Sequence, residues 1–198
     1  MPAAAPTVPN LSGSWEVDYA LSEDPNDKLR YLYEVTRSHL NQQLRRDDRP
    51  FSTIAAMADL QGLIDLGRLA DLIVRPGVLT IEQDGGGILV DREGDYTLTC
   101  DFLTRAITGN DLGRERCGWQ GDDLVFEVAL PDGLYVSHRF VLAENGSRLS
   151  VATTVAKDDV SQAFTVNRVF MPFEPGKGMY ECEQTVARGK TCRLGTSE

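Results

Sequence analysis

The stretch LVFEVALPDGLYVSHRFVLAENGSRLSVATTVAKDDVSQAFTVNRVFMP, residues 124–172, decides the fold. It holds four apolar-rich runs of strand length. Two of the turns between them contain Asp132-Gly133 and Asn145-Gly146, dipeptides that tolerate the positive φ of a tight hairpin turn. Because loops this short join strands that are neighbours in space, the four runs predict an antiparallel meander.

Further strands are predicted upstream of this meander. Residues 78–83, 88–92 and 96–102 are apolar-rich runs separated by glycine-containing turns, and residues 114–119 form a weaker candidate. Near the N-terminus, residues 15–21 alternate, with Trp15, Val17, Tyr19 and Leu21 on one face. Eight or nine such strands favour an up-and-down β-barrel, because closure removes the exposed edges of a sheet.

Two helices are expected between the first and second strands. Asp24-Pro25 combines an N-cap carboxylate with a proline at the first helical position, and Arg49-Pro50 breaks the helical run. A second helix is predicted from Ser52 to the break at Arg75-Pro76-Gly77. Its polar stripe is narrow, so most of its surface must be covered, and we expect it to form a lid over the barrel.

The chain therefore reads as one domain. A flexible spacer over residues 1–10 precedes a single β-barrel domain over residues 11–175, with a helical insertion at about 24–75, and a polar, irregular tail follows over 176–198. The formal net charge of −10 disfavours nucleic acid and anionic lipid surfaces as partners. The first ten residues lack the apolar core of a signal peptide, and we interpret them as the spacer of a mature exported protein. Envelope-membrane association would then need an N-terminal signal or lipid anchor that this chain does not include.

The cellular compartment is predicted from the four cysteines, which are Cys100, Cys117, Cys182 and Cys192. Without a Cys-x-x-Cys pair and with only two histidines, the chain lacks the ligand spacing of a structural zinc site. An even number favours two disulfides, Cys100–Cys117 and Cys182–Cys192, and hence a periplasmic or otherwise extracytoplasmic location. Four buried free thiols in a cytosolic protein are the alternative.

Gly13-Ser14-Trp15, at the start of the first strand, resembles the Gly-x-Trp signature of lipocalins. In that family the tryptophan closes one end of the barrel and packs on an arginine from the last strand. The resemblance therefore implies barrel closure by Gly13, Trp15 and Arg168. Departures are the absence of a Thr-Asp-Tyr motif and of a helix before a final strand, so the chain would be an outlying member. The resemblance further implies a barrel wide enough for one small ligand.

Candidate ligand contacts are large side chains at inward-facing strand positions: Tyr19, Tyr96, Leu98, Phe126, His138 and Phe140. No cofactor and no metal site is predicted. Asp122-Asp123 and Asp158-Asp159 fall in turns without the spacing of a calcium loop.

Catalytic patterns are weak. There is no Gly-x-Ser-x-Gly elbow, and Gly189-Lys190-Thr191 lacks the upstream glycine of a phosphate-binding loop. His138, on an apolar strand face, fits a hydrogen-bonded core residue better than a general base.

The sequence thus favours a binding protein over an enzyme: a carrier of a small apolar, lipid-like ligand in a barrel lumen of a bacterial-type envelope. Three alternatives stay open. One is a periplasmic lipoprotein or acyl-chain chaperone on an open barrel, in which helices plug a half-open sheet. The second is a small enzyme that uses His138 or a lumen carboxylate. The third is a structural envelope protein with a filled core.

Overall fold

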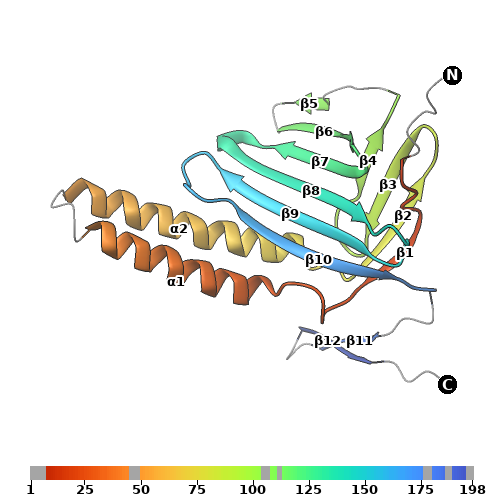
Figure 1. The fold of residues 1–198 in the computed structure, drawn as a ribbon, viewed down its shortest axis with the longest axis horizontal. Helices are drawn as coiled ribbons and strands as arrows, with labels where there is room; N and C mark the ends of the chain where they lie inside the picture. Colours follow the sequence, from red (N-terminus) through yellow and green to blue (C-terminus); the bar gives the residue numbers. More distant parts are fainter. Residues whose placement is uncertain are drawn as a thin grey trace.

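The computed structural model describes residues 8–44, 50–103, 108–110, 113–175, 180–185 and 189–194. In that part of the chain, ten antiparallel strands form one curled sheet, a nearly closed barrel, and two helices lie between the first and second strands (Figure 1). The predicted fold class is confirmed. The strands are β1 Gly13–Val17, β2 Val78–Gln83, β3 Gly87–Arg92, β4 Leu98–Asp101, β5 Thr108–Asn110, β6 Gly113–Gln120, β7 Asp123–Ala129, β8 Leu134–Leu142, β9 Leu149–Lys157 and β10 Phe164–Pro172.

The first strand lies in the middle of the sheet. The strand order is β4-β3-β2-β1-β10-β9-β8-β7-β6-β5, so β1 joins the hairpins β2–β4 to the meander β6–β10. Trp15 lies opposite Leu79 of β2 and Pro172 of β10. The alternation of apolar residues in β8 to β10 is reproduced as alternating burial, and β7 to β10 are sequential antiparallel neighbours, so the meander expected from residues 124–172 is present.

The barrel wall is interrupted between β4 and β6. Among the strand pairs described, β4 is hydrogen-bonded only to β3, and β6 to β5 and β7. The predicted disulfide Cys100–Cys117 is confirmed, and it links these two strands, with the Cα atoms 5.7 Å apart. The disulfide therefore joins β4 and β6 at the place where a closed barrel would have backbone hydrogen bonds between two neighbouring strands.

The C-terminal segment differs from the expected irregular tail. Strands β11 Tyr180–Thr185 and β12 Gly189–Leu194 form a separate two-stranded antiparallel sheet. Cys182 and Cys192 are directly opposite one another in its register. Their side chains lie outside the described residues, so the second disulfide stays a prediction. The N-terminal spacer also stays a prediction, because residues 1–7 are not described.

The first helix begins where the sequence predicts. In α1 Pro25–Leu44, the Asp24 carboxylate accepts hydrogen bonds from the backbone N–H groups of Asn26 and Asp27 at 2.8 and 3.0 Å, as an N-cap should. The second helix, α2 Pro50–Ile73, begins two residues earlier than expected and lies beside α1 (Figure 1).

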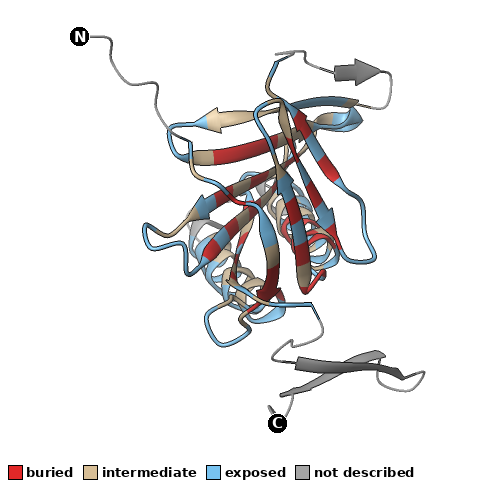
Figure 2. Ribbon diagram, turned by 90° about the vertical axis from the view of Figure 1, so that its right-hand side faces the viewer, coloured by how far each residue is buried: buried red, intermediate tan, exposed pale blue. Residues whose placement is uncertain are grey.

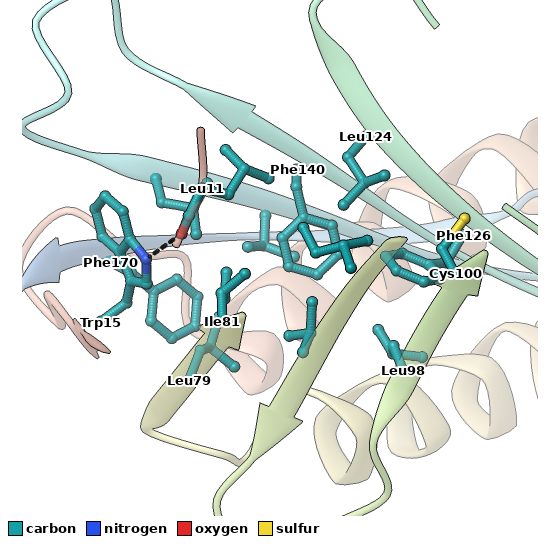
Figure 3. Close-up of a cluster of buried hydrophobic side chains, with 14 of the residues drawn as sticks. Leu11, Trp15, Leu79, Ile81, Leu98, Cys100, Leu124, Phe126, Phe140 and Phe170 are labelled. Atoms are coloured by element: carbon teal, nitrogen blue, oxygen red, sulfur yellow. Dashed lines mark hydrogen bonds between the residues drawn. The ribbon is translucent and has the colours of Figure 1, made fainter. Parts of the chain in front are cut away.

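One half of the core lies inside the barrel between β1–β4 and β7–β10 (Figure 3). At its end, the indole N–H of Trp15 donates a hydrogen bond to the Leu11 carbonyl at 2.9 Å. The Trp15 side chain is 4% exposed, so this polar group is satisfied inside an apolar cluster. The other large members are Leu79, Ile81, Ile88, Leu98, Leu124, Phe126, Phe140, Leu149 and Phe170.

The other half of the core belongs to α2. Leu63, Leu66 and Ala70 pack with Phe164 and Val166 of β10, and buried segments of the strands and the helix meet in the middle of the molecule (Figure 2). Since side chains alternate along a strand, Phe164 and Val166 share the face of β10 that carries Phe170 into the barrel cluster. The C-terminal half of α2 therefore lies on the inner face of the sheet as core, which corrects the expectation of a lid.

Two glycines of α2 have a packing reason. A Cβ at Gly67 would lie 2.6 Å from Leu29 of α1, and one at Gly62 would overlap Val160 in the β9–β10 turn. These positions let α2 approach both neighbours closely, a gain that offsets the helix propensity lost at glycine.

The arginine expected to pack on Trp15 has another partner. The guanidinium of Arg168 lies over the ring of Tyr19, 5.4 Å from its centroid. Trp15 lies beside Pro172, four residues further along β10. The closure contact implied by the lipocalin resemblance is thus replaced by a cation–π contact to Tyr19.

Candidate functional site

A cavity of about 540 Å³ lies between the C-terminal half of α2 and strands β4, β6, β7 and β8. This volume is within the range of small-molecule sites. We name it the outer cavity. Its apolar wall combines helix and sheet residues: Leu69, Ile73, Leu98, Phe126, Val128, Leu130, Leu134 and Val136.

Charged residues also line the outer cavity. Asp101, Glu115 and Arg116 are exposed, and Glu127 is half-buried. Glu127 accepts hydrogen bonds from the Tyr135 hydroxyl at 2.7 Å and from Nε of Arg116 at 2.6 Å. Burial alone would raise the pKa of Glu127, but these hydrogen bonds and the Arg116 charge hold it below its ordinary value. Arg116 and Glu127 are paired across the ladder one position along from Cys117 and Phe126, so this ion pair lies on the face of the sheet opposite Phe126.

A chain of polar contacts leads from the outer cavity into the protein interior. The Tyr96 hydroxyl lies 3.1 Å from Nε2 of His138, whose Nδ1 lies 3.0 Å from Oγ1 of Thr153. The Arg92 guanidinium lies over the Tyr96 ring, 4.5 Å from its centroid. His138 is 2% exposed, and both of its ring nitrogens are occupied.

The environment of His138 keeps its imidazole neutral. Burial, and then the positive charge of Arg92, lower the pKa of His138 to about 3. A general base working near neutral pH needs a pKa close to that pH and a free nitrogen. His138 has neither, so it is a hydrogen-bonded interior residue, the role that its apolar strand face predicts.

A second, smaller cavity of about 20 Å³ lies further inside, and we name it the inner cavity. Leu98 lines both cavities, and Phe126 of the outer cavity packs edge-on against Phe140 of the inner one, with ring centroids 5.8 Å apart. The polar residues that line the inner cavity are Arg92, His138, Thr153 and Arg168.

The predicted ligand contacts divide between these places. Tyr96, Leu98 and Phe126 line the outer cavity, and His138 and Phe140 line the inner one with Leu98. Tyr19 is 45% exposed and lines neither. Missing from the predicted ligand contacts are the α2 residues Leu69 and Ile73 and the interior Arg92, and Arg168 was predicted only as a closure residue.

The signal for the missing residues was partly in the sequence. Arg92 follows Ile88 and Val90 at alternate positions, and Arg168 stands between Val166 and Phe170 in the same way. Period 2 therefore assigns both arginines to the inner face. The apolar excess of α2 showed that Leu69 and Ile73 needed a partner, but not which one.

Two negative observations apply to the described part of the chain. It contains no group of three or more His, Cys, Asp or Glu residues placed to hold a metal ion. None of its helices is long and apolar enough to cross a membrane.

Searches for similarity to protein-family models, curated proteins and solved structures find no match. The case for a function therefore rests on the geometry of the two cavities.

The neutral state of His138 predicts a pH dependence of stability. Below its ordinary pKa of 6.5 the imidazole binds a proton in the unfolded chain, but in the folded protein only near pH 3. The stabilisation from a neutral His138 is therefore complete above about pH 6.5 and is lost progressively as the pH falls toward 3. Relative to a His138→Gln variant, which does not titrate, the free energy of unfolding of the wild type should fall by about 2–3 kcal/mol between pH 7 and 4.5.

Urea unfolding of both proteins at several pH values measures this difference, and the contributions of carboxylates common to both cancel. Parallel pH profiles for wild type and variant would show that His138 is already charged, or solvated, in the folded protein.

Proposed function

We propose that the protein binds and carries a small apolar, lipid-like molecule in the outer cavity. The observation that carries this proposal is an apolar-walled space of about 540 Å³ next to a core that is otherwise filled by large side chains. A purely structural barrel has no reason to retain such a space, because an empty cavity forfeits packing contacts.

The same proposal places the protein outside the cytoplasm. The disulfide Cys100–Cys117 supports an oxidising compartment such as a periplasm. We keep the lipocalin-like assignment as part of the proposal, on the strength of the nearly closed antiparallel barrel and the buried Trp15 at its end.

A chaperone of protein-borne acyl chains is a second candidate, favoured by one observation. The outer cavity is lined by residues of both β4 and β6, so it runs along the interruption of the barrel wall. A chain attached to a larger molecule could enter through this interruption, whereas the end of a closed barrel would admit only a free ligand.

Binding of the neutral fluorophore N-phenyl-1-naphthylamine tests the first proposal. Val128→Trp would fill part of the outer cavity, and we expect it to weaken binding by about tenfold or more, since a bulky side chain excludes the probe. Val141→Trp is the matched control, because Val141 is 38% exposed on β8 and lines neither cavity. Circular dichroism establishes that both variants are folded. Absence of binding by wild type, or equal binding by the two variants, would contradict the proposal.

A competition experiment separates the carrier from the chaperone. Hexadecanol and a peptide bearing a palmitoyl group compete for the same probe. Displacement by the alcohol alone favours the carrier of free ligands, and comparable displacement by the acylated peptide favours the chaperone.

A further inference from the structure

Two buried arginines line the inner cavity with unused hydrogen-bond donors. Arg92 is 6% exposed and Arg168 is 9% exposed. Within the described part of the chain, Nη1 of Arg92 and Nε of Arg168 are buried without a hydrogen-bond partner. Unsatisfied buried donors are rare in folded proteins, and those of a charged group are the most costly.

The partners that these arginines do have leave their charges incompletely compensated. Arg92 donates through Nη2 to the Ile73 carbonyl and lies 3.6 Å from the Asp95 carboxylate. Arg168 donates through Nη1 to the Glu23 carbonyl at 3.5 Å, and burial lowers its pKa. Among the residues that line the inner cavity there is no carboxylate. The cavity is therefore a place of positive potential with a neutral histidine beside it.

The size of the inner cavity limits what it can hold. About 20 Å³ is room for roughly one water-sized group. A chain or a ring cannot fit there, but a compact planar head can place an oxygen in it. Carboxylates match guanidinium groups in shape and charge, and these charge-assisted hydrogen bonds are the strong ones.

The inner cavity is adjacent to the apolar outer one. Leu98 lines both, and the consecutive residues Ile73 and Val74 at the end of α2 line the outer and the inner cavity respectively. Tyr96, in the wall of the outer cavity, is hydrogen-bonded to His138, in the wall of the inner one. One molecule with an apolar chain and a small head can therefore contact both.

We propose that the ligand is an aliphatic monocarboxylate, whose chain occupies the outer cavity and whose carboxylate is bound at the inner cavity by Arg92 and Arg168. This inference rests on the proposed function and adds the charge of the ligand to it. The unused Nη1 of Arg92 and Nε of Arg168 are the donors that the carboxylate satisfies.

Two ligands of equal chain length test the charge. Dodecanoate and dodecanol compete with the neutral naphthylamine probe at about pH 7.5, where the acid is ionised. We expect wild type to bind dodecanoate at least about tenfold more tightly than dodecanol. Arg92→Met and Arg168→Met should each lower the affinity for dodecanoate much more than the affinity for dodecanol, because methionine keeps the apolar bulk without the charge.

Arg148→Met is the matched control. Arg148 is exposed and lines neither cavity, so its loss should leave the preference intact. Arg116→Met tests a different position for the head, because Arg116 lines the outer cavity. If Arg116→Met removes the preference and Arg92→Met does not, the head lies at Arg116 and the inference is overturned.

Two other outcomes distinguish failure of this inference from failure of the proposed function. Equal affinities of wild type for dodecanoate and dodecanol would mean that water alone occupies the inner cavity, which overturns this inference and leaves the proposed function standing. Failure of both ligands to bind would remove the proposed function itself.

Should the arginine variants fail to fold, wild type alone still tests the inference. The carboxyl carbon of ¹³C-labelled dodecanoate reports its own titration by NMR when bound. Two guanidinium groups should lower the pKa of the bound acid below that of the free acid. A pKa that is unchanged or raised on binding would contradict the assignment.

Discussion

The double variant Leu63→Ala, Leu66→Ala should be largely unfolded, or retain only a small fraction of the wild-type stability. These side chains are 1% and 3% exposed and lie in the cluster that α2 forms with β8, β9 and β10. Truncating a buried leucine to alanine costs about 2–5 kcal/mol, so the pair approaches the 5–15 kcal/mol that stabilises a typical domain.

Urea unfolding followed by tryptophan fluorescence measures the loss, and Leu72→Ala is the control. Leu72 belongs to the same helix but is 53% exposed, so its truncation should cost less than about 1 kcal/mol. If the double variant instead keeps its unfolding midpoint and loses only ligand, α2 is a detachable cover and not core.

Replacing Cys100 and Cys117 by serine should lower the free energy of unfolding by about 3 kcal/mol. The bridge spans 17 residues, and the loop-closure entropy that it removes from the unfolded chain corresponds to roughly this amount. In the folded protein it is also the covalent link between β4 and β6, which both line the outer cavity. We therefore expect the variant to release the naphthylamine probe faster than wild type.

The Cys182→Ser, Cys192→Ser variant is the matched control, since β11 and β12 form a sheet of their own. It should leave both the stability of the barrel and probe release close to wild type. Equal destabilisation by the two double variants would show that the Cys100–Cys117 bridge has no special role at the interrupted wall.

The parts of the fold that the sequence predicted are those set by local chemistry. Strand β2 and the cap at Asp24 follow from alternation and from one side-chain hydrogen bond, and both are present at the expected residues. Tyr19 shows where such reasoning stops. Alternation assigned it to the first strand, but Asp18 accepts hydrogen bonds from the N–H groups of Ala20 and Leu21, and this turn takes Tyr19 out of the sheet.

The position of α2 could not be obtained in the same way. A helical sequence that is apolar on most of its surface predicts that the helix is covered. The sequence pattern is the same whether such a helix covers the end of a barrel or fills its interior. The two glycines that touch Leu29 and Val160 appear in the sequence only as helix-weakening residues. The close packing that these glycines allow depends on neighbours that are distant in the sequence. The location of the outer cavity depends on such distant neighbours too.

The central place of β1 has a consequence for how fast the chain reaches this structure. Strand β1 pairs with β10, whose partner residues stand more than 150 positions later, as between Val17 and Phe170. The meander β6–β10 can assemble from local hairpins, but it joins β2–β4 only when this pairing of very high sequence separation forms. Non-local pairing carries a large loop-closure entropy before any contact repays it, and folding rates fall accordingly. During synthesis, the edge of β1 that pairs with β10 would therefore stay unpaired until the residues of β10 have been made.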